Sequence, residues 1–95
     1  MTQQIQAARL DAVSLGLAFG IMWALGVFIL GVMAAAADWG TDIVLLMSSV
    51  YLGFDPSFAG SLIGAAWGFA DGGVGGLLIA WLYNVILARR LAARD

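Results

Sequence analysis

Two long runs of apolar residues dominate the chain. The first extends from Ala12 to Ala37 without a charged side chain, and the second from Phe58 to Ala88 with Asp71 as its one charge. A helix needs about 20 residues to cross the hydrocarbon core of a bilayer. Neither run alternates with the period of two that a membrane-spanning strand requires. The pattern therefore predicts two membrane-spanning helices.

The second span is preceded by a strong helix-start signal. Asp55 can cap a helix with its carboxylate, and Pro56 suits the first helical position. We therefore place the two spans at about residues 12–37 and 56–90, in a single membrane domain that covers residues 1–95.

A shorter apolar stretch separates the two spans. Thr41 or Asp42 can cap its start and Gly53 suits its end, which predicts a short helix over about residues 42–52. Such a helix is too short to cross a bilayer. It lies either in the outer interface or dips into the membrane as a re-entrant element. The predicted fold is an all-α transmembrane hairpin with an interfacial or re-entrant helix between the spans.

The composition supports a membrane protein. The 95 residues are 63% hydrophobic and 11% charged, with a mean hydropathy of +1.00. A soluble domain of this length cannot bury so much apolar surface. Cysteine and histidine are absent from the sequence, and no nucleophile–base pair, phosphate loop or metal-ligand cluster is visible. We expect no enzyme, cofactor, metal site or nucleic-acid partner.

Charges of opposite sign lie on opposite sides of the two spans. The basic residues lie where the chain enters the first span and leaves the second. The acidic residues lie in the segment that connects the two spans. The two groups are Arg9, Arg89, Arg90 and Arg94, and Asp38, Asp42 and Asp55. The positive-inside rule predicts cytoplasmic termini and an external loop, which in a bacterium means a multi-pass inner-membrane protein. The three acids either gather cations at an outer mouth or are solvated interface charges.

The alanine run at the end of the first span also resembles a small-residue cleavage site. It occupies residues 33–37. A signal peptide has an apolar region of about 7–15 residues, which is shorter than the one here. We expect the first span to be retained.

Glycine recurs every fourth residue along the second span. This glycine ladder comprises Gly60, Gly64, Gly68, Gly72 and Gly76, and the first span has a shorter row of Gly16, Gly20 and Ala24. Such rows let helix backbones approach closely in membranes. The ladder either packs the two helices of one chain together, or joins chains into a homo-oligomer, or does both.

Two polar residues interrupt the second span. A carboxylate in an apolar helix is costly and marks a candidate functional site, and a helical projection directs Asp71 toward the face of the glycine ladder. Asp71 is either a neutral hydrogen-bonding strut between helices or a group that meets cations or protons in a hydrated lumen. Asn84 contacts headgroups or bonds across a subunit contact, and is a second candidate for an ion-facing position.

The stretch from Gly60 to Asn84 resembles a family of small bacterial two-span membrane proteins. Its marks are the pattern Trp-Gly-Phe-x-Asp-Gly, which begins at Trp67, then Gly-Gly, and a Leu-Tyr-Asn end. Members of this family are often identified as bacteriophage holins or grouped as a domain of unknown function. The resemblance implies oligomerisation and permeabilisation of the inner membrane.

Two functions remain open from the sequence. The first is a holin-like homo-oligomeric pore or ion-conducting protein, assembled through the glycine ladder with Asp71 near its axis. The second is a non-conducting structural or accessory subunit of a larger membrane complex. A hydrated position for Asp71 favours the first, and a dry contact favours the second.

Overall fold

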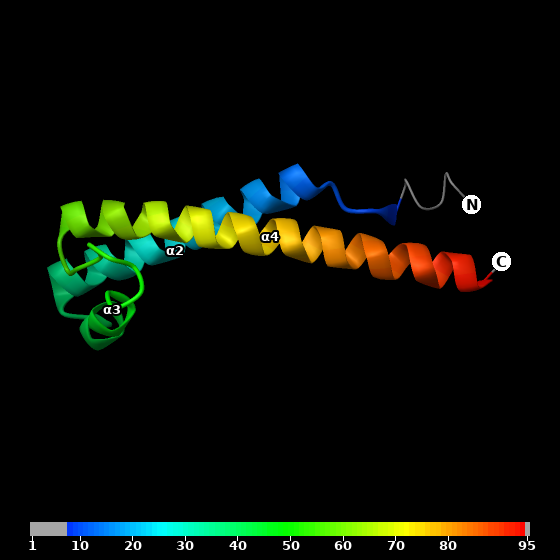
Figure 1. Cartoon of the computed structure of the whole chain (residues 1–95). Coiled ribbons are helices and arrows are strands. Elements are labelled where there is room, and N and C mark those ends of the chain that lie inside the picture. The colour runs from blue at the N-terminus through cyan, green and yellow to red at the C-terminus, as the bar shows by residue number, and fades with distance from the viewer. Residues whose placement is uncertain (1–7, 95) are drawn as a thin grey trace.

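The computed structural model describes residues 8–94, which form a hairpin of two long helices with a short helix between them (Figure 1). In chain order the elements are α2 (Ala12–Ala37), α3 (Thr41–Met47) and α4 (Phe58–Arg94). No strand occurs in this described part, which agrees with the all-helical class. Both α2 and α4 are long and apolar enough to cross a membrane. The first and last residues of the predicted domain, 1–7 and 95, lie outside the described residues.

Helix α2 has the predicted bounds, and a carboxylate fixes its start. Asp11 occupies the N-cap position and accepts hydrogen bonds from the backbone N–H (3.0 Å) and the hydroxyl of Ser14. These hydrogen bonds hold the pKa of Asp11 below its ordinary value. The bond from the Ser14 hydroxyl has the larger effect, and the bond from the Ser14 N–H the smaller. At the other end, Asp38 adopts the left-handed conformation, with φ of 51°, and its N–H closes the helix on Ala34 O (3.1 Å).

Helix α3 is shorter than the predicted helix over residues 42–52. Gly40 takes the N-cap position in place of Thr41, with a left-handed φ of 72°. The helix ends at Met47 because the chain then tightens into turns, in which the N–H of Val50 donates to Met47 O (3.0 Å).

Helix α4 begins at Phe58 and ends at Arg94, so both of its ends lie later in the chain than predicted. Ser57 explains the later start. Its hydroxyl oxygen accepts the N–H of Gly60 (2.9 Å), as an N-cap does, while its own proton goes to the Asp55 carboxylate. Asp55 therefore supports the capping serine instead of capping the helix itself.

The glycine ladder faces the inside of the hairpin. Its five glycines are all buried, and Ala80 continues the row. A Cβ added at Gly72 would lie 2.7 Å from Phe19 O, and one at Gly76 would lie 2.7 Å from Leu15 O. The backbones of α2 and α4 thus touch along the inner half of the ladder, the half near the arginines. Because α2 covers this face, a contact between chains has to use another surface of the hairpin.

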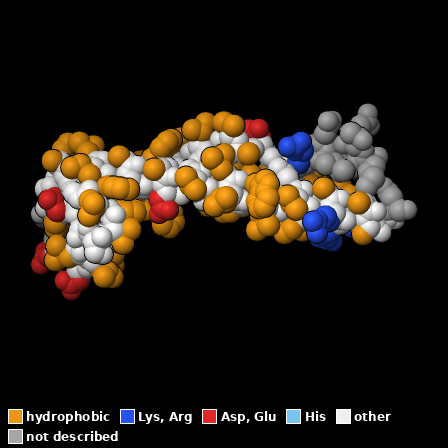
Figure 2. All heavy atoms as spheres, in the orientation of Figure 1, with side chains coloured by type: hydrophobic (Ala, Val, Ile, Leu, Met, Phe, Trp, Pro, Cys, Tyr) orange, Lys and Arg blue, Asp and Glu red, His pale blue; other side chains and the backbone are white. Residues whose placement is uncertain are grey.

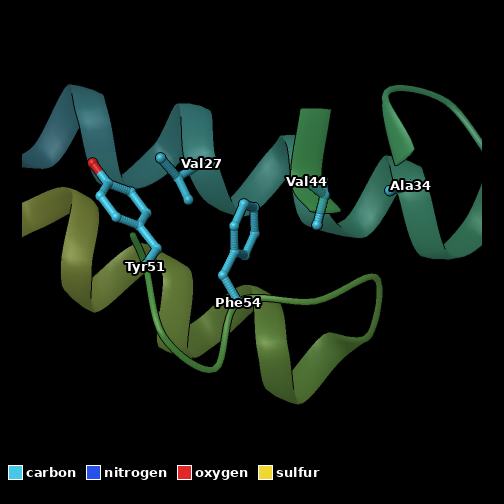
Figure 3. Packing of buried hydrophobic residues seen from close by; sticks show 5 residues of the cluster. All are labelled: Val27, Ala34, Val44, Tyr51 and Phe54. Carbon is cyan, nitrogen blue, oxygen red and sulfur yellow. The ribbon is translucent and has the colours of Figure 1, made fainter. Parts of the chain in front are cut away.

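The outer half of the ladder receives the connecting segment instead of α2. A Cβ added at Gly64 would collide with the ring of Phe54, and one at Gly31 on α2 would lie 2.9 Å from the same ring. Phe54 is 1% exposed and lies between the two long helices as a wedge. It belongs to a small core with Val27, Ala34, Val44 and Tyr51 (Figure 3).

The connecting segment folds back along the hairpin. The indole N–H of Trp67 donates to Leu52 O (2.9 Å), and the hydroxyl of Tyr51 reaches Asp71. Asp71 lies 13 residues inside α4, which corresponds to about 20 Å of helix. Whether the segment is interfacial or re-entrant in a membrane stays a prediction.

The surface of the hairpin is apolar between charged ends. Large hydrophobic side chains are exposed along both long helices, among them Met22 (69%) and Trp81 (62%). Figure 2 shows arginines toward one end and a group of carboxylates at the opposite end, with hydrophobic side chains and a few further carboxylates between them. This distribution is compatible with two helices in contact with lipid.

Two adjacent glycines of α4 provide a matched test of the backbone contact. We expect Gly76→Ala to destabilise the hairpin by about 1–3 kcal/mol, because the new methyl group meets the backbone of α2. Gly75→Ala adds a methyl group where nothing of the same chain lies within 4 Å, and in the monomeric hairpin it should be neutral or stabilising by up to about 1 kcal/mol. Thermal unfolding in detergent, followed by circular dichroism, measures both. Equal melting temperatures for the two variants would show that the close approach is absent.

Candidate functional site

Asp71 is the acceptor at the end of a short chain of hydrogen bonds. The indole N–H of Trp23 donates to the hydroxyl oxygen of Tyr51 (3.1 Å), and the Tyr51 hydroxyl donates to Asp71 Oδ2 (2.5 Å). The three side chains come from α2, the connecting segment and α4. A hydrogen bond to an ionised acceptor is shorter and stronger than one between neutral groups.

Trp67 frames this chain of hydrogen bonds. It precedes Asp71 by one helical turn, and its ring stacks on that of Tyr51 with centroids 6.1 Å apart and planes 12° apart. Its indole N–H is bound to Leu52 O, so it also secures the backbone next to Tyr51. Tyr51 is 8% exposed, and its position is fixed by the two tryptophans together with Asp71.

Asp71 itself is exposed, on the flank of the hairpin where the connecting segment lies. The helical projection of the sequence had directed it toward the ladder, because it shares the direction of Gly64. The ladder rotates by about 40° at each step, however, so Gly64 faces Phe54 while Gly72 faces α2. Asp71 and Gly64 thus both face the connecting segment, and Asp71 is not enclosed between the two long helices.

This geometry leaves the carboxylate able to interact further. Within residues 8–94, Asp71 has a hydrogen bond at Oδ2 only, and its side chain is exposed. A carboxylate in this position can accept another hydrogen bond, bind a cation or take up a proton. Among the described residues no group of three His, Cys, Asp or Glu side chains could hold a metal ion.

Asn84 joins the start of α2 to α4 at the arginine end of the hairpin. Its Oδ1 accepts the N–H of Leu10 (2.8 Å), and its amide NH₂ donates to Leu10 O (2.9 Å). The amide therefore holds Leu10, the residue before the N-cap of α2, against α4. An ion-facing role for Asn84 stays a prediction, and the contacts seen within the chain are those of a helix clamp.

The three acids of the predicted outer mouth lie between the end of α2 and the start of α4, at the turn of the hairpin and away from the arginines. Two of them form local contacts: Asp38 accepts the hydroxyl of Thr41 (2.6 Å), and Asp55 accepts that of Ser57. Asp42 lies exposed in the first turn of α3. Their role as a mouth that gathers cations stays a prediction.

Sequence reasoning missed the partners of Asp71. A buried tyrosine hydroxyl or tryptophan N–H usually finds a hydrogen-bond partner, and Asp71 is the one carboxylate within either predicted span. The need of tyrosine and tryptophan for hydrogen-bond partners could have indicated that such residues bind Asp71. It could not identify Trp23 and Tyr51, because their pairing with Asp71 depends on how far the connecting segment folds back.

Comparison of the chain with protein-family models, with curated proteins and with solved structures gives no match.

The hydrogen bond between Tyr51 and Asp71 predicts non-additive effects on stability. Hydrogen bonds between membrane helices contribute about 0.6–1.7 kcal/mol, so Tyr51→Phe and Asp71→Ala should share a coupling energy of that size. Thermal or chemical unfolding of the two single variants and the double variant measures it. Tyr83→Phe, which removes the hydroxyl of a tyrosine that is 45% exposed, is the control and should leave stability unchanged. Full additivity would mean that the bond contributes nothing.

Proposed function

We propose that this chain forms a homo-oligomeric, ion-conducting assembly in a bacterial inner membrane, with Asp71 beside the conduction path. The observation that carries the proposal is the exposed carboxylate at mid-height of an otherwise apolar hairpin. The proposal retains the holin-like function that the sequence resemblance implies. It differs in the surface through which the chains meet.

The argument for assembly starts from the cost of a carboxylate in lipid. Charged side chains at the centre of a bilayer face a bundle interior or a water-filled cavity. Tyr51 provides one hydrogen bond to Asp71, and the remaining surface of the carboxylate points away from its own hairpin. A two-helix hairpin is too small to enclose a lumen. Several hairpins arranged with their Asp71 flanks inward would provide one.

A neighbouring chain can approach closely beside Asp71. Gly75 lies one turn further along α4, and a Cβ added there would have nothing within 4 Å. Small residues at such open positions allow helices of different chains to come together. The proposed contact between chains therefore uses the flank of α4 that carries Asp71 and Gly75, and leaves the glycine ladder to α2.

The alternative function is that of a non-conducting accessory subunit in a larger membrane complex. The same exposed carboxylate favours it if a polar or basic group of another protein covers Asp71. Such a subunit would keep Asp71 in a dry contact and would conduct nothing when purified alone.

The proposed orientation places the arginine end in the cytoplasm. All arginines of the described helices and Arg9 lie at one end, and the positive-inside rule assigns this end to the cytoplasmic side. The chain has no cysteine, so labelling of a single introduced cysteine reports on that position alone. We expect Thr41→Cys, but not Ala93→Cys, to react with an impermeant thiol reagent applied to intact cells. The reverse labelling pattern would invert the topology.

Ion conduction is tested with the purified protein in liposomes. We expect a cation flux that Asp71→Asn reduces by at least about tenfold, because a carboxylate about 4 Å from a cation stabilises it by about 4 kcal/mol near a protein surface. Asp42→Asn removes the same charge at the outer end and is the matched control, with a smaller effect. The oligomer mass, measured in nanodiscs, should be the same for all three proteins.

The two functions differ in one outcome of this experiment. An intact wild-type oligomer without flux at any pH supports the accessory-subunit function. A monomer in nanodiscs, with or without flux, contradicts the proposed assembly.

A further inference from the structure

We infer that cations reach Asp71 from the outer side of the membrane, along the face of the connecting segment. This inference deepens the proposed function and rests on its membrane orientation. It assigns an outer access route to the carboxylate.

The first argument is the backbone of the connecting segment. Residues 48–57 are not helical, yet they extend to the level of Trp67 on α4, about 13 Å inside that helix. Irregular backbone at such depth is tolerated where protein buries it or where it borders water. Protein buries Tyr51 and Phe54, whereas Ser49 and Leu52 are exposed. The exposed side of the segment is therefore suited to border water.

The second argument is a hollow that leads to Tyr51. It has a volume of about 340 Å³ and is lined by Leu46, Met47, Ser49, Val50 and Tyr51. The hydroxyl of Tyr51 donates to Asp71 at 2.5 Å. Ser49, Tyr51 and Asp71 thus form a polar series that descends from the acidic end of the hairpin into its middle.

The third argument is the absence of a corresponding series on the inner side. Residues 72–82 of α4 and 15–22 of α2 contain only glycine and apolar side chains. At Gly72 and Gly76 an added Cβ would already lie 2.7 Å from the backbone of α2, so no water fits between the helices there. The polar approach to Asp71 along this hairpin is therefore the one from the outer end.

Cysteine accessibility tests this inference without measuring flux. The probe is a membrane-impermeant, positively charged methanethiosulfonate, applied to right-side-out and to inverted vesicles that contain the full chain. The reporters are Ser49→Cys, on the hollow, and Asp71→Cys, beside the hydroxyl of Tyr51. Ala66→Cys is the matched control. It is exposed and lies five residues nearer the outer end than Asp71, but helical geometry places it about 140° around α4 from Asp71.

We expect both reporters to react faster from the outside than from the inside. Ala66→Cys should remain unmodified from both sides, although it is less deep than Asp71. Faster reaction of Asp71→Cys from the inside, or equal reaction of Ala66→Cys, would overturn the inference. So would an unreactive Asp71→Cys in vesicles where Thr41→Cys is labelled.

Asp71→Cys removes the hydrogen bond between Tyr51 and Asp71 and can disturb the local structure. Ser49→Cys leaves that bond intact, so it reports on the access route without this disturbance. If Ser49→Cys is not labelled from outside, the access route is absent, whatever happens at position 71. The results also separate this inference from the proposed function. Labelling from outside without flux would leave the route valid and reject conduction, and flux without such labelling would do the opposite.

Discussion

The contact between the backbones of α2 and α4 at Gly72 and Gly76 determines the arrangement of the rest of the molecule. Lipid tails are as apolar as leucine, so membrane helices gain little from hiding apolar side chains and associate through close van der Waals contact. Without side chains at these positions, the main chains touch, with an added Cβ only 2.7 Å from α2. Every other feature of the hairpin is placed relative to this contact.

The same four-residue repeat has a different use at the outer end. Because the ladder winds around α4, its outer glycines turn away from α2 and leave a space beside the contact between Gly31 of α2 and Ser61 of α4. Phe54 fills that space and holds the connecting segment against the two long helices. Once Phe54 is inserted, Tyr51 comes within hydrogen-bonding distance of Trp23 and Asp71. The environment of the carboxylate is thus a consequence of glycine spacing.

The sequence predicted the elements that depend on local pattern. The bounds of helix α2 were predicted correctly because an uncharged apolar run defines them. The start of α4 was missed because two capping residues compete, and the serine wins over the preceding aspartate. The bonds between Tyr51 and Asp71 and between Leu10 and Asn84 join residues 20 and 74 positions apart. Periodicity carries no information about such pairs, since they depend on the path of the connecting segment and the register of the helices.

The clamp formed by Asn84 and the wedge formed by Phe54 hold opposite ends of the hairpin. Paired hydrogen bonds to both the N–H and the C=O of Leu10 fix its direction as well as its distance. With one end held this way and the other filled by an aromatic ring, α2 cannot rotate about its own axis relative to α4 without breaking one of the two attachments. Motions of the intact hairpin are therefore restricted to bowing of the helices between the attachments, in the region that contains both Asp71 and the glycine contact beneath it.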